Sequence, residues 1–295
     1  MVDSLVDEER HSITGTRLRA TVLAAGAELC SLTADGEELM WQAGAAWPKH
    51  APVLFPTVGT LTGNRLLHHG VSYPMGRHGF AREQRFAWAE RTASSCRLVL
   101  EDNASTRAVF PFAFRLELGF AIAGDVLEVA YVLTNPGAEV LPAAMGGHPA
   151  FNWPLRAEVA KDAYGIEFAA DEPAPIRRVG RDGLLLDEAF ATPVRGRHLA
   201  LNEAIFAADA IIMERPASRS LRYAGPEGPA IEFSWDDGFP SFGIWSPPGV
   251  GLLCLEPWHG MSSPAGFDGA FIDKPGIMRL APGESRRAAY RVGLG

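Results

Sequence analysis

The feature that most constrains the fold of this sequence is a strict alternation of apolar and polar residues near its middle. Within 114–122 (FRLELGFAI), every second residue from Leu116 to Ile122 is apolar. Successive side chains of a β-strand point to opposite faces, so a period of two predicts a strand with one buried face. The alternation resumes over 126–135, and the Gly124-Asp125 pair between the two runs predicts a hairpin.

Shorter runs of the same kind recur along the chain. They lie at 17–25, 27–32, 95–102, 230–235, 242–246, 251–256 and 286–294. Turn-forming pairs such as Asp35-Gly36 and Asp237-Gly238 separate the runs, and one weak helical candidate lies at 201–210. Because the strands follow one another without amphipathic helices, the sequence predicts an all-β fold, an antiparallel β-sandwich.

The length and composition favour one domain. A chain of 295 residues with 47% hydrophobic residues can bury a large core, and no repeat or linker divides it. We therefore predict a single domain over 15–295. Residues 1–14 are expected to form a loose leader, because the segment starts with an acidic stretch that lacks the apolar region of a secretory signal.

Charge, hydropathy and cysteine spacing argue against several classes of function. The net charge of −8 disfavours nucleic acid and anionic membranes as partners, and no apolar run reaches the 18 or more residues of a membrane span. Cys30, Cys96 and Cys254 form no CxxC pair and are odd in number, which argues against a disulfide framework or a zinc ribbon. These features predict a cytoplasmic protein.

Two short motifs each place one titratable side chain at the end of an apolar run. They are GGHPAFNW (146–153), with His148, and CLEPWHG (254–260), with Glu256. Two glycines before His148 allow a close approach of backbone or ligand, and a buried carboxylate at 256 is costly unless it is paired or used. We therefore favour functional roles over a core histidine and a structural ion pair. Pro257 is expected to end the strand of Glu256.

Other side chains could bind a small polyol, and each also has a plain structural explanation. Arg77 and His78, with Arg82, lie in RHGFAR (77–82), which is either a set of hydroxyl donors or a polar loop. Arg65 is either a sugar clamp or a surface arginine, and Asp209 on local grounds is an ordinary carboxylate. Flat rings that could pack on sugar C–H faces are Trp41, Trp153, Trp245 and Trp258.

A metal site is not expected from the histidines. His68 and His69 are adjacent, and adjacent residues of a strand point to opposite faces; no HxH or HExxH spacing occurs. His259, close to Glu256, is interpreted as a sugar-contacting or structural residue. The hydrolase motif GxSxG and a P-loop are also absent from the sequence.

Five motifs in order resemble the aldose 1-epimerases, or galactose mutarotases, with the LacX-like branch as the closest match. They are PVLFPTVG (52–59), YPMGRHGFAR (73–82), FPFAFRLELGF (110–120), GGHPAFNWPL (146–155) and CLEPWHG (254–260). The resemblance covers roughly residues 15–293. It implies a β-sandwich of the galactose mutarotase type, the supersandwich, which interconverts sugar anomers by acid–base ring opening without a metal or other cofactor.

The resemblance also assigns roles by motif. Glu256 matches the general base and His148 the general acid, while His78 matches a histidine that helps to hold the ring oxygen. Asp209 matches a sugar-binding aspartate, and Arg65 the substrate arginine. Many relatives have Gly-Arg where this chain has Gly59-Thr60, so Arg65, Arg77 or neither fills the arginine role. The expected partner is a small sugar, and the expected assembly is a monomer or a homodimer.

Three other functions stay open at this stage. A mutarotase of hexose 6-phosphates would need basic residues at the site, for which Arg77, Arg82 and Arg85 are available. A non-catalytic carbohydrate-binding protein would have no need of an acid–base pair. A glycosidase or lyase would prefer paired carboxylates, and only Glu256 is placed by a motif.

Overall fold

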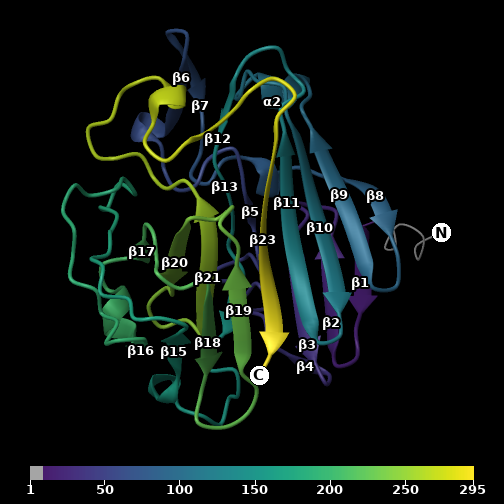
Figure 1. Cartoon of the computed structure of the whole chain (residues 1–295), viewed down its shortest axis with the longest axis vertical. Coiled ribbons are helices and arrows are strands. Elements are labelled where there is room, and N and C mark those ends of the chain that lie inside the picture. Colours follow the sequence, from purple (N-terminus) through teal and green to yellow (C-terminus); the bar gives the residue numbers. More distant parts are fainter. Residues whose placement is uncertain (1–8) are drawn as a thin grey trace.

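The computed structural model describes residues 9–295, and the largest sheet in that part of the chain has nine antiparallel strands (Figure 1). The predicted hairpin lies within it: Arg115 pairs with Thr134 and Ala123 with Val126, and the apolar face is buried. The strands, in spatial order, are β16 (His198–Ala200), β15 (Gly165–Phe168), β18 (Ser220–Ala224), β19 (Ile231–Trp235), β23 (Ser285–Leu294), β11 (Val126–Thr134), β10 (Arg115–Ala123), β9 (Ser95–Glu101) and β8 (Ala87–Arg91).

A second sheet faces the middle of the first and carries the candidate site. Its path is β17 (Ile211–Met213), β20 (Ser241–Trp245), β21 (Leu252–His259), β13 (Met145–Gly147) and β5 (Val53–Leu54), with β14 (Ala150–Asn152) also paired to β21. The smaller sheets are β1 (Arg10–Thr14), β2 (Leu18–Leu23), β3 (Leu29–Ala34) and β4 (Glu37–Glu38); β6 (Arg65–His68) with β7 (Val71–Pro74); and β12 (Leu141–Ala143) with β22 (Met278–Leu280). Short helical turns are η1 (Thr62–Asn64), η2 (Ala81–Glu83), α2 (Ala104–Arg107), η3 (Lys161–Ala163), η4 (Glu203–Phe206) and η5 (Phe271–Asp273).

Aromatic side chains fill the space between the two larger sheets. Phe233 of β19 lies with its ring centroid 6.3 Å from that of Phe151 in β14 and 5.8 Å from that of Phe242 in β20. Tyr290 of β23 stacks on Phe233 at 5.3 Å. Large aromatic rings bury the most apolar area per residue, so these contacts between sheets hold the sandwich together. The predicted all-β antiparallel sandwich is confirmed.

The sequence-based expectations for the N-terminal leader and for a helix over 201–210 need correction. The part of the predicted leader that is described is not loose: Arg10–Thr14 forms β1 and pairs with β2, while residues 1–8 lie outside the described residues. The helix expected over 201–210 is only the 3-10 turn η4, and the chain leaves helical geometry at Asp209, where φ is +65°. The single-domain boundary at 15–295 stays a prediction.

Pro257 does not end its strand. β21 continues through it to His259, with Pro257 opposite Phe242 of β20. The N–H of Leu255 in β21 donates to the carbonyl of Pro149. Alternate residues of a strand direct their N–H groups to the same side, so the backbone nitrogen of residue 257 faces the interruption between β13 and β14. A missing N–H there costs no ladder hydrogen bond, and the proline is tolerated inside the strand.

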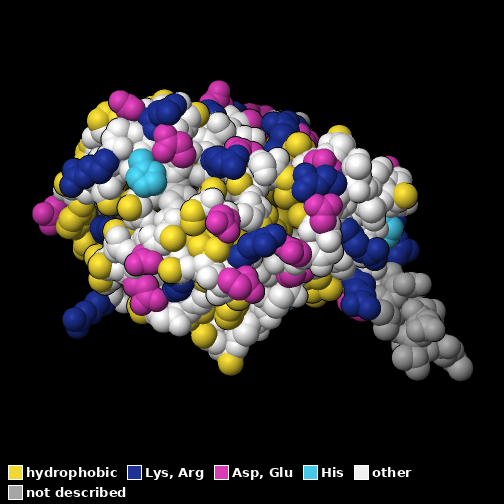
Figure 2. Space-filling model, turned by 90° about the horizontal axis from the view of Figure 1, so that it is seen from below, with side chains coloured by type: hydrophobic (Ala, Val, Ile, Leu, Met, Phe, Trp, Pro, Cys, Tyr) yellow, Lys and Arg dark blue, Asp and Glu magenta, His cyan; other side chains and the backbone are white. Residues whose placement is uncertain are grey.

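Charged side chains of both signs are interspersed on the face seen in Figure 2. Many form pairs across strands; on the nine-stranded sheet, Glu128 of β11 accepts from Arg287 and Arg291 of β23. Exposed pairs of this kind contribute little stability each. Within residues 9–295, no helix has the length and apolar character needed to cross a membrane.

Candidate active site

β21 places Glu256 on the face of its sheet that points away from the main core. Leu253 and Leu255 belong to the core between the sheets, whereas Glu256 and Trp258 lie on the opposite face. Gly243 is paired with Glu256 on the neighbouring strand, and a Cβ built on it would lie 2.5 Å from the Trp258 ring. The glycine is therefore what allows the indole to lie flat beside the carboxylate.

The two glycines before His148 serve the close approach that the sequence predicts. A Cβ on Gly146 would lie 2.6 Å from the ring of Trp258, and one on Gly147 would lie 2.8 Å from the ring of Tyr290. His148 follows them in the interruption between β13 and β14, next to β21. Its Nε2 is 3.1 Å from Oε2 of Glu256, so the structure brings the two residues of the short motifs into direct contact.

Three other rings surround the His148 imidazole. Trp47 stacks on it with centroids 5.3 Å apart and an interplanar angle of 28°, and Trp245 and His78 approach edge-on at 6.0 Å and 5.6 Å. The indole N–H of Trp41 donates to the carbonyl of Trp47 at 2.8 Å, which fixes the loop that carries this ring. Sequence reasoning missed Trp47, because it lies in a loop where no periodic pattern marks it.

His78 is held in one orientation by the backbone. It is buried, adopts a φ of +68°, and its Nδ1 accepts a hydrogen bond of 3.1 Å from the N–H of Gly59. The Nε–H of Arg77 donates toward the other ring nitrogen, Nε2, at 3.3 Å. Burial lowers the pKa of His78 well below its ordinary value, and the charges of His148, Arg77 and Arg82 lower it further. His78 is therefore a neutral imidazole whose single acceptor nitrogen can be satisfied by Gly59 or by Arg77.

Arg77 lies in the same cavity as His148 and Glu256, and Arg65 does not. Nε of Arg77 is 3.3 Å from Nε2 of His78. Arg65 is exposed at the start of β6 and lines a different, much smaller cavity. Thr60, at the position where many relatives are expected to have arginine, is buried under the turn at Gly183. Of the two candidate clamps, the structure brings only Arg77 to the acid–base pair.

The cavity at the pair has a volume of about 200 Å³. Besides the residues above it is lined by Asp209, Trp258 and Arg82. The carboxylate of Asp209 accepts from the N–H of Ala210 at 2.7 Å, which fixes it at the rim. Cavities for drug-sized ligands are larger than this, so the volume suits a monosaccharide. His259 lies outside it and lines a neighbouring cavity of about 780 Å³.

Burial acts on the acid–base pair in opposite directions. It raises the pKa of the Glu256 carboxyl well above its ordinary value, although the positive charge of Arg77 opposes this. It lowers the pKa of the His148 imidazole to about 3. Both shifts favour uncharged side chains, since each charge loses hydration in the cavity. The favoured state of the pair consequently has the proton on Glu256 and a neutral His148.

Three buried polar atoms at the cavity have no hydrogen-bond partner among residues 9–295. They are Nδ1 of His148, Nε1 of Trp258 and Oε2 of Glu256, whose 3.1 Å approach to Nε2 of His148 is an ion-pair contact without hydrogen-bond geometry. Leaving such an atom unsatisfied costs about 1–3 kcal/mol. Polar groups of a ligand that offered hydrogen bonds to these atoms would remove that cost.

The fold is thus an antiparallel sandwich whose small, ring-lined cavity holds a histidine and a glutamate in contact. The chain belongs to the aldose 1-epimerase family, whose model matches residues 9–263.

Among curated proteins, the chain is 29% identical to LacX of Lactococcus lactis subsp. lactis over 279 residues, which covers 90% of this chain and 93% of LacX. Among solved structures, a galactose mutarotase-like protein from Lactobacillus casei ATCC 334 is 28% identical, with a TM-score of 0.90, and the match covers 97% of this chain and all of that one. A galactose mutarotase related enzyme from Lactobacillus acidophilus is also 28% identical, with a TM-score of 0.88 and 97% of both chains covered. These relatives support the LacX-like resemblance.

Proposed function

We propose that this protein is an aldose 1-epimerase that interconverts the α and β anomers of a free aldose. The observation that carries the proposal is the 3.1 Å contact between His148 Nε2 and Glu256 Oε2 inside a cavity of monosaccharide size. In a cyclic aldose, the anomeric O1 and the ring O5 are bonded to the same carbon. A base for O1 and an acid for O5 must therefore lie side by side, as these two groups do.

The reaction follows from these positions. Ionised Glu256 takes the proton of the O1 hydroxyl while protonated His148 gives a proton to O5, and the C1–O5 bond breaks to leave an open-chain aldehyde. Rotation about C1–C2 presents the other face of the carbonyl to the C5 hydroxyl. Ring closure with both proton transfers reversed gives the other anomer and restores the starting protonation. These steps use side chains alone, so no cofactor is invoked.

The buried environment favours the proton distribution of the open-chain state. Ring opening converts an ionised glutamate and a charged imidazole into two neutral groups. Because burial raises the pKa of Glu256 and lowers that of His148, the neutral pair is the favoured one. The site thus supplies driving force for both proton transfers at the moment when the ring opens.

The remaining cavity residues are proposed to bind the sugar. His78 would hydrogen-bond to the ring oxygen or a neighbouring hydroxyl, and Arg77 and Asp209 would hold further hydroxyl groups. Trp258 would contribute a flat face, and its indole N–H a donor. The cytoplasmic location and the choice between monomer and homodimer stay predictions.

A second candidate function is the same reaction on a hexose 6-phosphate. Arg77 and Arg82 both line the cavity, and Nε of Arg82 is buried without a hydrogen-bond partner among the described residues. Guanidinium groups are well suited to phosphate oxygens. A third candidate, a sugar-binding protein without catalysis, is weakened by the acid–base contact of His148 and Glu256, which binding alone does not need.

Polarimetry on freshly dissolved sugars tests the proposal. With α-D-glucose or α-D-galactose, the wild-type protein is expected to speed the change in rotation, and Glu256→Gln to lose about 10²–10⁴-fold of that activity. Glu227→Gln, the same change in an exposed loop, serves as the matched control. Acceleration only with α-D-glucose 6-phosphate would select the phosphosugar, and sugar binding without any acceleration would contradict the enzymatic proposal.

A further inference from the structure

A second cluster of ligand-type side chains lies at the β6–β7 hairpin, remote in sequence from the acid–base pair. His68 ends β6, and His69 and Gly70 form the turn with φ angles of +50° and +76°. The argument that adjacent histidines face opposite ways applies to a strand and is wrong here, since His69 lies in the left-handed turn. The two imidazole rings lie on the same side, with centroids 4.0 Å apart.

Glu139 approaches both imidazoles from a different part of the chain. Its Oε2 is 3.6 Å from Nε2 of His68 and 3.9 Å from Nε2 of His69. These separations are too long for hydrogen bonds. They suit atoms that share a cation, because ligands about 2.1 Å from a tetrahedral Zn²⁺ lie roughly 3.4 Å from one another. One ligand atom from each residue lies within 4.8 Å of the others.

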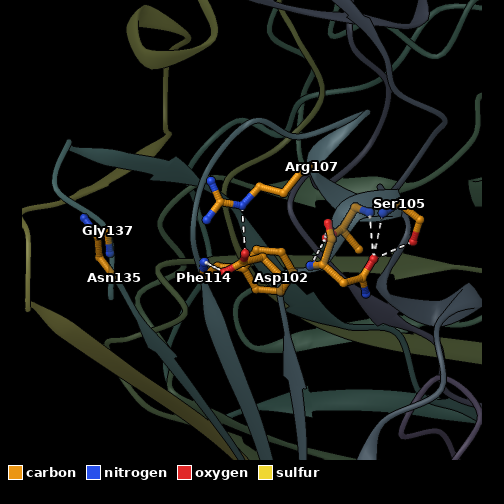
Figure 3. A network of polar contacts seen from close by, with 8 residues as sticks. Asp102, Ser105, Arg107, Phe114, Asn135 and Gly137 are labelled. Atoms are coloured by element: carbon orange, nitrogen blue, oxygen red, sulfur yellow. Dashed lines mark hydrogen bonds and ion pairs between the residues drawn. The ribbon is translucent and has the colours of Figure 1, made fainter.

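Both segments that carry the ligands are held by hydrogen bonds and packing. The ring of His68 packs against that of Phe112, with the ring centroids 4.5 Å apart. Asp102 fixes the loop that carries Phe112: its carboxylate accepts from Arg107 Nε at 2.7 Å and from the N–H of Phe114 at 3.1 Å (Figure 3).

The turn that carries Glu139 is fixed by a buried asparagine. Asn135 donates from its side chain to the carbonyls of Glu139 and Leu280, each at 2.8 Å. It also accepts from the N–H of Gly137 at 2.9 Å; these two residues are labelled in Figure 3. The backbone of the carboxylate ligand is therefore positioned before any ion arrives, and only the exposed ends of Glu139 and His69 need to adjust.

We propose that His68, His69 and Glu139 form a zinc-binding site. Two imidazoles and one carboxylate are ligands that Zn²⁺ takes, with water completing the coordination on the exposed side.

The bound ion would join two segments that both lead into the active site. From β7 the chain reaches Arg77 and His78 within four residues, and from Glu139 it passes through β12 and β13 to His148. An ion that binds the folded chain and not the unfolded one stabilises it by mass action. Zinc is therefore expected to raise the unfolding temperature of the whole protein. This site does not depend on the proposed sugar chemistry.

Titration calorimetry of tag-free, EDTA-treated protein with ZnCl₂ tests the site. The wild type is expected to bind one equivalent of zinc. His69→Ala removes an exposed ligand and is expected to weaken zinc binding by more than about tenfold, because even mutation of a residue that only hydrogen-bonds to a metal ligand lowers metal affinity by about 10–100-fold. Glu139→Gln is expected to do the same. His198→Ala is the matched control, because His198 pairs with Glu167 at 3.4 Å in a pair that lacks a second histidine.

The controls also separate this cluster from the other one with suitable ligands, His148, Cys254 and Glu256. Cys254→Ser is expected to leave the binding of one zinc unchanged. Loss of binding in Cys254→Ser but not in His69→Ala would overturn the proposal, as would the absence of binding to the wild type. Anomalous scattering at the zinc edge from a soaked crystal should place the ion between His68, His69 and Glu139.

Discussion

Substitution of Gly243 by alanine should disturb the active site through one identifiable contact. The new Cβ would lie 2.5 Å from Cη2 of Trp258, 2.6 Å from its Cζ2 and 3.0 Å from its Cζ3. Carbon atoms in contact normally lie about 3.5–4.0 Å apart, so the indole must move by about 1 Å. Overpacking of this size typically costs about 1–3 kcal/mol of unfolding free energy.

That movement predicts a loss of activity as well. Trp258 belongs to a buried cluster with Val58, Ala210 and Ile212 and lines the cavity that holds Glu256, so a displaced indole changes the shape of that cavity. Gly243→Ala is expected to lower kcat/KM for the sugar by at least about tenfold, because small displacements of a site residue commonly cost about 100-fold.

Gly119→Ala is the matched control, since it also adds one methyl group to a strand. The nearest atom to its Cβ would be Cβ of Ala130 at 3.9 Å, an ordinary contact. Glycine inside a strand is about 0.5–1 kcal/mol less favourable than alanine, so this variant should be slightly more stable and fully active. Urea unfolding and polarimetry measure both effects. A Gly243→Ala protein with the stability and kcat/KM of the wild type would refute the reasoning.

Three further predictions concern the cavity. Because burial lowers the pKa of His148 to about 3, the second protonation of the pair falls far below neutral pH, and kcat/KM should not decline as the pH is lowered from about 7 to about 5; a decline with a half-maximal point near the ordinary histidine pKa would contradict this. Arg77→Ala should lower kcat/KM about 10–100-fold through lost charged hydrogen bonds, while Arg65→Ala leaves it unchanged; equal losses would refute the choice of clamp. Trp47→Ala should reduce turnover by up to about tenfold by removing the ring stacked on His148, and unaltered kinetics would deny Trp47 a positioning role.

Local patterns predicted the strands and the two central side chains. The alternation from Leu116 to Ile122 reflects one buried face, a property of the strand itself, and β10 and β11 follow it. Gly146-Gly147 before His148 and the apolar run before Glu256 are also local patterns. The two residues that they single out are in contact in the structure. Periodicity and spacing therefore identified residues whose surroundings are set by their own strand.

The remaining site residues depend on contacts between distant segments, which no local pattern records. Trp47 comes from a loop and reaches His148 only through the folded chain. Arg77 lines the cavity of the acid–base pair and Arg65 lines another cavity, although both lie close to the β6–β7 hairpin in sequence. The left-handed φ of His69 reverses the expected direction of one ring, and a histidine at that turn position is not signalled by sequence alone.

The most direct test of the acid–base account is exchange NMR on an equilibrated sugar such as galactose. The spectrum follows the anomeric protons, so it reports opening and closing of the ring itself. The wild type should give exchange cross-peaks between the α and β anomers, and Glu256→Gln and His148→Asn should each remove them while the folded spectrum of the protein persists. Undiminished exchange in either folded variant would contradict the central claim that this pair opens the ring.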